Sequence, residues 1–291
     1  MTSGRPSGAG IGYLDGLSEA DLELVAAAAG LAARPERLRA EPGLLERLLA
    51  DEGVARAVLG GADAPEPELS RASPFLLFAV AVERVAADLR EATYVQEWVG
   101  PRQRLPVLGA DDLRELLADA GRRAFLAALL ASYTRVASGT VWRRTPRGPR
   151  RQRFSELDPA RLAALLDELP ESRHAAVHRR LGDLSLFLTG VFPDHTAGRI
   201  FNPIDLNRLG RAAAAGGGDP GLVEALETRG GVGLLEELGA RWYRLAARAA
   251  PPPAGPLLDS VAARFGEARR ALNVLTDRHL FPVREGLFPT P

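Results

Sequence analysis

The sequence predicts a mainly α-helical fold, with an orthogonal or bundle-like globular core of about eight to ten helices and one small basic β-hairpin. Apolar residues recur at helical spacing in several long segments. A capping side chain followed by proline occurs at Ser73-Pro74, Asp158-Pro159 and Asp219-Pro220. Ser or Asp accepts a hydrogen bond from an unpaired helix N–H, and proline at the first helical position has no N–H to leave unpaired. We therefore expect helices to begin at these three places.

Two long helices are expected in the first half of the chain. After Pro74, apolar residues follow a helical period to Leu89, which predicts a central core helix. A second helix is expected from Asp111 or Asp112 to about Val136, because acids suit the positive end of the helix dipole.

Three further helical segments are expected towards the C-terminus. The first runs from Glu171 through Leu188 and ends before Pro193. The second spans 219–249 and is interrupted near Gly230, which opens a Gly-Gly-Val-Gly run. The last begins at Pro256, and its apolar stripe predicts that it packs against the core.

Composition shifts divide the chain into four predicted parts. Residues 1–16 are expected to be a flexible tail, and 17–59 an acidic helical segment. Residues 60–72 are rich in Gly, Pro and acids and are expected to be a linker. Residues 73–291 form the predicted helical core domain, with the hairpin near 140–154.

The residue types that are absent exclude several chemistries. With 46% apolar residues in 291, the chain can bury a sizeable core, but it has no Cys and no Lys. Disulfides, thiolate nucleophiles and zinc thiolates are excluded, as are Schiff bases and the lysine of a phosphate-binding Walker loop. No cofactor is expected, and we lean towards a protein that is not an enzyme.

No targeting or membrane-spanning segment is evident. The N-terminus is small and polar and lacks the apolar core of a secretory signal. The most apolar runs, such as 74–82 and 184–193, are far shorter than the roughly 20 residues that a bilayer requires. We expect a cytoplasmic protein without a membrane partner.

The strongest functional indication is a 36-residue stretch, 120–155, that holds nine arginines and no acid. Its core, 140–154, predicts a β-hairpin whose four-residue loop, 146–149, is flanked by Trp142 and Phe154 as an apolar anchor. The candidate binding residues are Trp142, Arg143, Arg144, Arg147, Arg150, Arg151 and Arg153.

Such a cluster has several possible partners. Our leading interpretation is a non-enzymatic interaction or regulatory protein that docks these arginines on an acidic protein surface. The alternative is a nucleic-acid-associated protein that clamps the phosphate backbone with the same hairpin. Docking on the chain's own acidic N-terminal segment, or simple solvation, also fits the pattern. The arginine richness itself is also what genomic base composition would produce.

Histidines provide the remaining candidates for chemistry. His174 and His178 are four residues apart and so share a helix face, and Glu171 precedes His174 at the spacing used in di-iron bundles. These three are the candidate metal ligands, although such bundles need two Glu-x-x-His pairs and further glutamates, and the chain has one pair.

Asp194 and His195 form the candidate acid–base pair. An apolar run before them would supply the wall of a helix-lined pocket, which is a third hypothesis, of an enzyme or ligand receptor. The competing interpretation is a helix-terminating turn in which Asp194 caps Thr196 or Gly198. No dinucleotide, phosphate-loop, nucleophile-elbow or HExxH motif is present.

Overall fold

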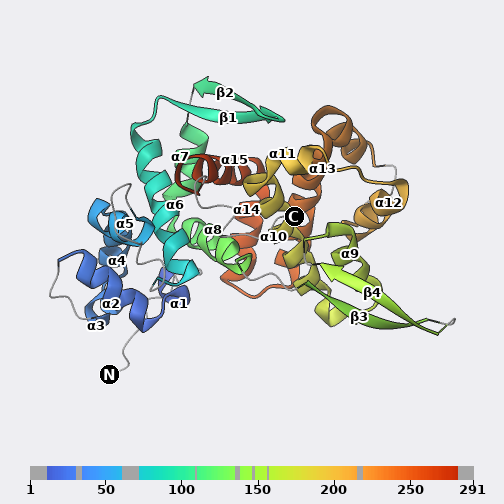
Figure 1. Cartoon of the computed structure of the whole chain (residues 1–291), viewed down its shortest axis with the longest axis horizontal. Coiled ribbons are helices and arrows are strands. Elements are labelled where there is room, and N and C mark those ends of the chain that lie inside the picture. Colours follow the sequence, from blue (N-terminus) through green and yellow to red (C-terminus); the bar gives the residue numbers. More distant parts are fainter. Residues whose placement is uncertain are drawn as a thin grey trace. The chain divides into compact units, whose positions relative to one another are not determined.

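The computed structural model describes residues 12–30, 35–60, 72–108, 110–134, 138–145, 148–155, 157–214 and 219–280. Within these ranges the chain forms 15 α-helices and two separate two-stranded sheets, so the mainly α prediction is confirmed (Figure 1). The helices outnumber the eight to ten expected because several predicted segments are divided into shorter helices. No helix in the described ranges is both long enough and apolar enough to cross a bilayer.

The chain divides into two compact units. Unit 1 comprises Met1–Glu97, Leu105–Thr134 and Arg270–Pro282, and unit 2 comprises Trp98–Arg104, Arg135–Arg269 and Val283–Pro291. The predicted acidic segment 17–59 therefore belongs to the same unit as the helix that follows Pro74. The predicted tail, linker and core boundaries stay predictions, and most of the tail and linker lie outside the described residues.

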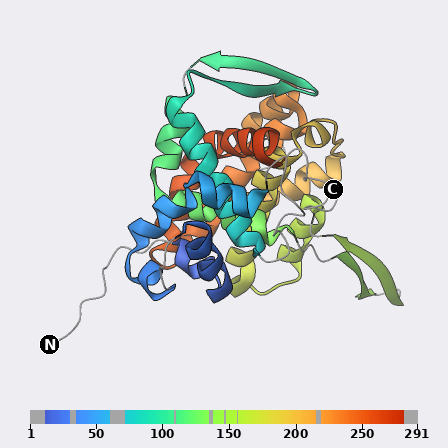
Figure 2. The same ribbon diagram turned by 60° about the vertical axis from the view of Figure 1, so that its left-hand side comes forward.

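Unit 1 is built around the predicted core helix, α6 (Pro74–Glu91), which buries most of its first three turns. Helices α4, α5, α7 and α8 pack against it, and α1 contacts both α6 and α8. The other helices of unit 1 are α1 (Tyr13–Gly16), α2 (Glu19–Ala28), α3 (Pro35–Ala40), α4 (Pro42–Leu49), α5 (Glu52–Leu59), α7 (Asp111–Ala118) and α8 (Ala120–Ser132). Figure 2 shows the N-terminal helices, in blue, against α6.

Unit 2 centres on the packed pair α10 (His174–Val191) and α13 (Pro220–Ala249). Gly182 of α10 makes this close approach possible, because a Cβ there would lie 2.5 Å from Cδ1 of Tyr243. The remaining α-helices and 3-10 helices of unit 2 are α9 (Pro159–Ala163), η2 (Ala164–Asp167), η3 (Glu171–Arg173), α11 (Pro193–Ala197), α12 (Pro203–Ala212) and α14 (Ala254–Ala263). The boundary between the units falls within α15 (Phe265–Leu275), which a short π-helix, η4 (Thr276–Leu280), follows.

All three predicted helix starts are confirmed. Ser73 Oγ accepts from Leu76 N at 3.1 Å, and Asp158 Oδ1 accepts from Ala160 N at 3.0 Å. The Asp219 carboxylate caps α13 in the same way, and proline is the first helical residue each time. The predicted interruption of α13 is confirmed as well, since Gly230 has φ 58° and ψ −147°.

The long helix predicted from 111 to 136 is wrong, because the chain bends at Asp119 (φ −86°, ψ 121°). The Asp119 carboxylate accepts from Arg122 N at 2.8 Å and so begins a new helix, α8. The Arg122 side chain turns back and donates to the carbonyls of Leu116 and Glu115 at 2.7 and 2.8 Å. These bonds satisfy carbonyls that α7 leaves unpaired at its end. The final helix from Pro256 is likewise two helices, α14 and α15, separated at Arg264.

A second hairpin was not predicted. Strands β1 (Tyr94–Gly100) and β2 (Gln103–Leu108) are joined by Pro101 and Arg102, and Arg102 has φ 58°. Proline followed by a residue in the left-handed region is the pattern of a type II turn, but glycine or asparagine normally takes that second place. Because an arginine occupies this position, the residue pattern of the sequence does not indicate a turn.

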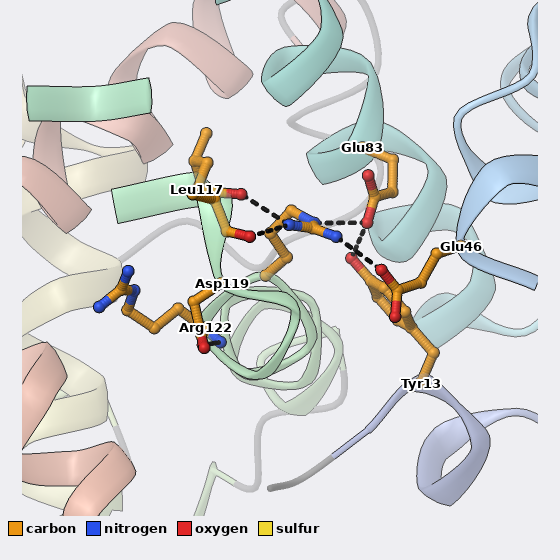
Figure 3. A network of polar contacts seen from close by, with 8 residues as sticks. Tyr13, Glu46, Glu83, Leu117, Asp119 and Arg122 are labelled. Atoms are coloured by element: carbon orange, nitrogen blue, oxygen red, sulfur yellow. Dashed lines mark hydrogen bonds and ion pairs between the residues drawn. The ribbon is translucent and has the colours of Figure 1, made fainter. Parts of the chain in front are cut away.

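A buried polar network holds the centre of unit 1 (Figure 3). Arg123 donates from Nε to Glu83 Oε1 at 2.6 Å, from Nη2 to Glu46 Oε2 at 3.0 Å and from Nη1 to the carbonyl of Leu117 at 2.7 Å. The Tyr13 hydroxyl donates to the same Glu83 oxygen at 2.7 Å. Burial, and then the charge of Glu83, raises the pKa of Tyr13 well above its usual value, so the phenol keeps its proton and remains a donor.

We expect Arg123→Met to lower the free energy of unfolding by about 3–5 kcal/mol, because it leaves the Glu83 carboxylate buried without its cation. Urea unfolding followed by circular dichroism measures the loss. The double variant Glu83→Gln, Arg123→Met should lose less than Arg123→Met alone, because the uncompensated charge is gone.

Arg84→Gln is the matched control on α6. Its guanidinium lies 3.8 Å from Asp88 with a partly exposed side chain, so we expect a loss below about 1 kcal/mol. If Arg123→Met and Arg84→Gln lowered the free energy of unfolding equally, the expected contribution of the buried network would be contradicted.

Candidate functional site

The predicted basic hairpin forms, as strands β3 (Ser138–Thr145) and β4 (Gly148–Ser155) in an antiparallel two-stranded sheet. Thr145 pairs with Gly148, so the connection has two residues and not the four expected. Gly148 and Pro149 belong to the strand because β4 is an edge strand, where a proline without an N–H is tolerated. Arg147 lies outside the described residues.

The register also corrects the expected apolar anchor. Trp142 pairs with Arg151 and Phe154 pairs with Gly139, so Trp142 and Phe154 are not cross-strand partners. Directly paired residues share a face of the sheet and neighbours along a strand alternate. Trp142 and Phe154 therefore occupy positions on opposite faces.

The register distributes the arginine positions over both faces. Arg143 pairs directly with Arg150 on one face. Arg144, Arg151 and Arg153 take positions on the other, together with Trp142. Five arginine positions thus lie within a two-stranded ribbon, and Figures 1 and 2 show that ribbon extending from the helices of unit 2.

Asp194 lies in α11 and is bound to the β1–β2 turn. Its Oδ1 accepts from Trp98 Nε1 at 2.7 Å and from Arg102 N at 3.0 Å, while Arg104 Nη1 lies 3.8 Å away. The Gly198 N–H donates to the Asp194 backbone carbonyl. These contacts give the carboxylate a role in fixing the turn, and they hold Arg102 in its left-handed conformation.

His195 follows Asp194 but is exposed, and it forms no hydrogen bond or ion pair with any described residue. Thr196, next to it, is buried and donates to the carbonyls of Leu188 and Phe192, both at 2.9 Å. The pair Asp194–His195 stays a prediction as an acid–base site, and the turn contacts explain Asp194 without catalysis.

Of the three candidate metal ligands, the two histidines form hydrogen bonds with backbone groups and the glutamate is exposed. Glu171 is exposed in η3, and His174 Nε2 donates to the carbonyl of Leu169 at 3.0 Å. His178 forms a hydrogen bond to the backbone of Ala212, and burial, followed by the charge of His174, lowers its pKa. Across the described ranges no three His, Asp or Glu side chains are placed to hold a metal ion.

The two histidines instead lie at a cavity of about 380 Å³ that the sequence did not predict. The charged residues that line it with them are Asp167, Arg208 and Arg211. They come from η2 and α12, and α12 begins more than twenty residues after His178. No local spacing pattern connects residues so far apart, and only the packing of α12 beside α9 and α13 brings them together.

Asp194→Ala removes the acceptor for Trp98 and Arg102, so we expect the β1–β2 turn to open more often. A charge-assisted hydrogen bond is worth about 1.5–3 kcal/mol, and the partly exposed carboxylate should give the lower end, about tenfold faster amide exchange at Arg102. Hydrogen exchange measured by mass spectrometry tests this. His195→Ala is the control and should leave the exchange rate unchanged.

Comparison of the chain with family models, with curated proteins and with solved structures finds no match.

Proposed function

We propose that the protein is a non-enzymatic interaction protein that docks hairpin β3–β4 on an acidic surface of another protein. The observation that carries this proposal is the direct pairing of Arg143 with Arg150 in the register. Like charges directly opposite each other destabilise a sheet. A two-stranded hairpin has few other interactions to offset that cost. An anionic partner would convert the repulsion into attraction.

The two strands contain no acid of their own, and the first carboxylate after them in the sequence is that of Glu156. Elsewhere in the described chain, arginines commonly have a carboxylate within a turn or two of the same helix. Arg37 pairs with Glu41 at 3.2 Å, and Arg179 pairs with Asp183 at 2.9 Å. The five arginine positions of the two strands have no acid between them, so one nearby carboxylate, Glu156, is too little to balance their charge.

The form of the hairpin favours a protein partner. Both strands are edge strands, because the sheet has only two members, and an edge offers backbone N–H and C=O groups to another extended chain. Guanidinium groups bind carboxylates with two parallel hydrogen bonds. An extended acidic segment could therefore pair its backbone with an edge strand of the hairpin and its carboxylates with the arginines of the same hairpin.

The test is fluorescence anisotropy of the full chain with a labelled poly-glutamate peptide, in parallel with a labelled DNA duplex, over a range of salt concentrations. We expect saturable peptide binding that weakens at least tenfold in the variant in which Arg143, Arg144, Arg150 and Arg151 are all changed to Gln. We expect this weakening because the variant removes four of the five positive charges in the two strands.

The control variant has the same charge change, placed on exposed arginines of helices and turns, namely Arg90, Arg173, Arg244 and Arg248. It should bind the peptide as the unmodified protein does. Equal weakening in both variants would reduce the effect to net charge and contradict docking through the hairpin. Binding of the duplex but not the peptide, with a log–log salt slope of about −4 to −5, would replace the proposal with a phosphate clamp.

A further inference from the structure

The cavity of unit 2 combines an apolar wall with an excess of positive charge. Leu166 and Leu245 contribute apolar surface from η2 and α13. Arg208 and Arg211 contribute two permanent positive charges from α12, against the single lining carboxylate of Asp167. Its volume of about 380 Å³ lies within the range of small-molecule sites, which is roughly 300–1,000 Å³.

Neither arginine of the cavity is fully paired by the part of the chain that the structure describes. Arg208 Nη1 is 3.9 Å from Asp205 Oδ1, which is beyond hydrogen-bond distance, and its Nε is covered and without an acceptor. The side chain of Arg211 forms no ion pair or hydrogen bond with any described residue. A buried donor without an acceptor carries a free-energy cost, because it has lost its hydrogen bonds to water. A small turn of the Arg208 guanidinium towards an acceptor in the cavity would remove that cost.

The two histidines lie beside these arginines. Their ring centroids are 6.4 Å apart, and one nitrogen of each is engaged by a backbone carbonyl, of Leu169 for His174 and of Ala212 for His178. Both residues line the cavity, and for neither ring is a second side-chain hydrogen bond to a described residue found. Burial, followed by the charge of His174, lowers the pKa of His178, so its imidazole is neutral near pH 7.

We propose that this cavity binds a small organic anion, whose phosphate or carboxylate group is held by Arg208 and Arg211 beside His174 and His178. The apolar wall would take the carbon skeleton of the ligand. A guanidinium group can donate two parallel hydrogen bonds to two oxygens of one phosphate or carboxylate group, which imidazole or lysine cannot do. This site is separate from hairpin β3–β4 and does not depend on the docking proposal.

The chain supplies its own internal reporters, because it has only four histidines and two of them line the cavity. The experiment is NMR titration of the histidine ring signals of the full chain, with inorganic phosphate in one arm and succinate in the other. Ionic strength is held constant with chloride. We expect the signals of His174 and His178 to shift saturably in at least one arm, with those of His195 and His279 unchanged. The arm that saturates at the lower concentration identifies the preferred acid group.

Two variants connect the shifts to the arginines. Arg211→Gln changes an exposed side chain and should preserve the fold, while weakening the affinity at least tenfold. Arg208→Gln should weaken it by a similar factor. Arg248→Gln is the matched control, since Arg248 is also an exposed arginine in the last turn of a helix but does not line the cavity. Its affinity should equal that of the unmodified protein.

Three results would overturn the proposal. They are no saturable shift of His174 and His178 in either arm, equal shifts of all four histidines, and an affinity that Arg211→Gln leaves unchanged.

Discussion

The Arg123 guanidinium is the interaction on which the arrangement of unit 1 depends. It joins Glu83 of α6 and Glu46 of α4 to the carbonyls of Leu117 and Ala118 at the end of α7. Through Glu83 it also holds the Tyr13 hydroxyl of α1. Burying two opposite charges costs several kcal/mol of lost hydration, so such a network adds little net stability over an apolar core. What the network does is connect four helices, since its hydrogen bonds join α1, α4, α6 and α8 and the end of α7 through a single guanidinium.

Besides the arginines in ion pairs such as Arg37–Glu41, the chain has three groups of arginines that composition cannot separate. Arg122 and Arg123 bind the unpaired carbonyls of α7, and therefore contribute two of the nine positive charges of 120–155 to internal structure. Arg208 and Arg211 line a cavity. Five arginine positions lie in the two-stranded ribbon of β3 and β4, where Arg143 is directly opposite Arg150. The role of an arginine in this chain therefore depends on the element to which it belongs. It binds carbonyls at the end of a helix, lines a cavity, or occupies a position in a two-stranded sheet.

Local signals explain what was predictable from the sequence. Ser73, Asp158 and Asp219 marked helix starts correctly, because a cap and its proline act within one turn. Asp119 was missed because its cap has no proline after it, and the apolar stripe continues across the bend. Hairpin β3–β4 was predicted from the Gly-containing turn segment 146–149 between Trp142 and Phe154. The register of the hairpin was not predicted, because the spacing of residues along the sequence does not show which residues pair across the strands. The cavity was beyond prediction for the same reason, as only tertiary packing brings α12 to His174 and His178.

Genomic base composition would produce arginine in place of lysine, but it would not produce a stretch without acids such as 120–155. The chain as a whole has equal numbers of acidic and basic residues, 37 of each, and an even distribution would place about four or five acids in a stretch of this length. Their absence extends to β3 and β4, where Arg143 lies directly opposite Arg150. A carboxylate at either position would have given a favourable cross-strand pair in place of a repulsive one. This pairing supports the proposal that a second molecule supplies negative charge to the ribbon.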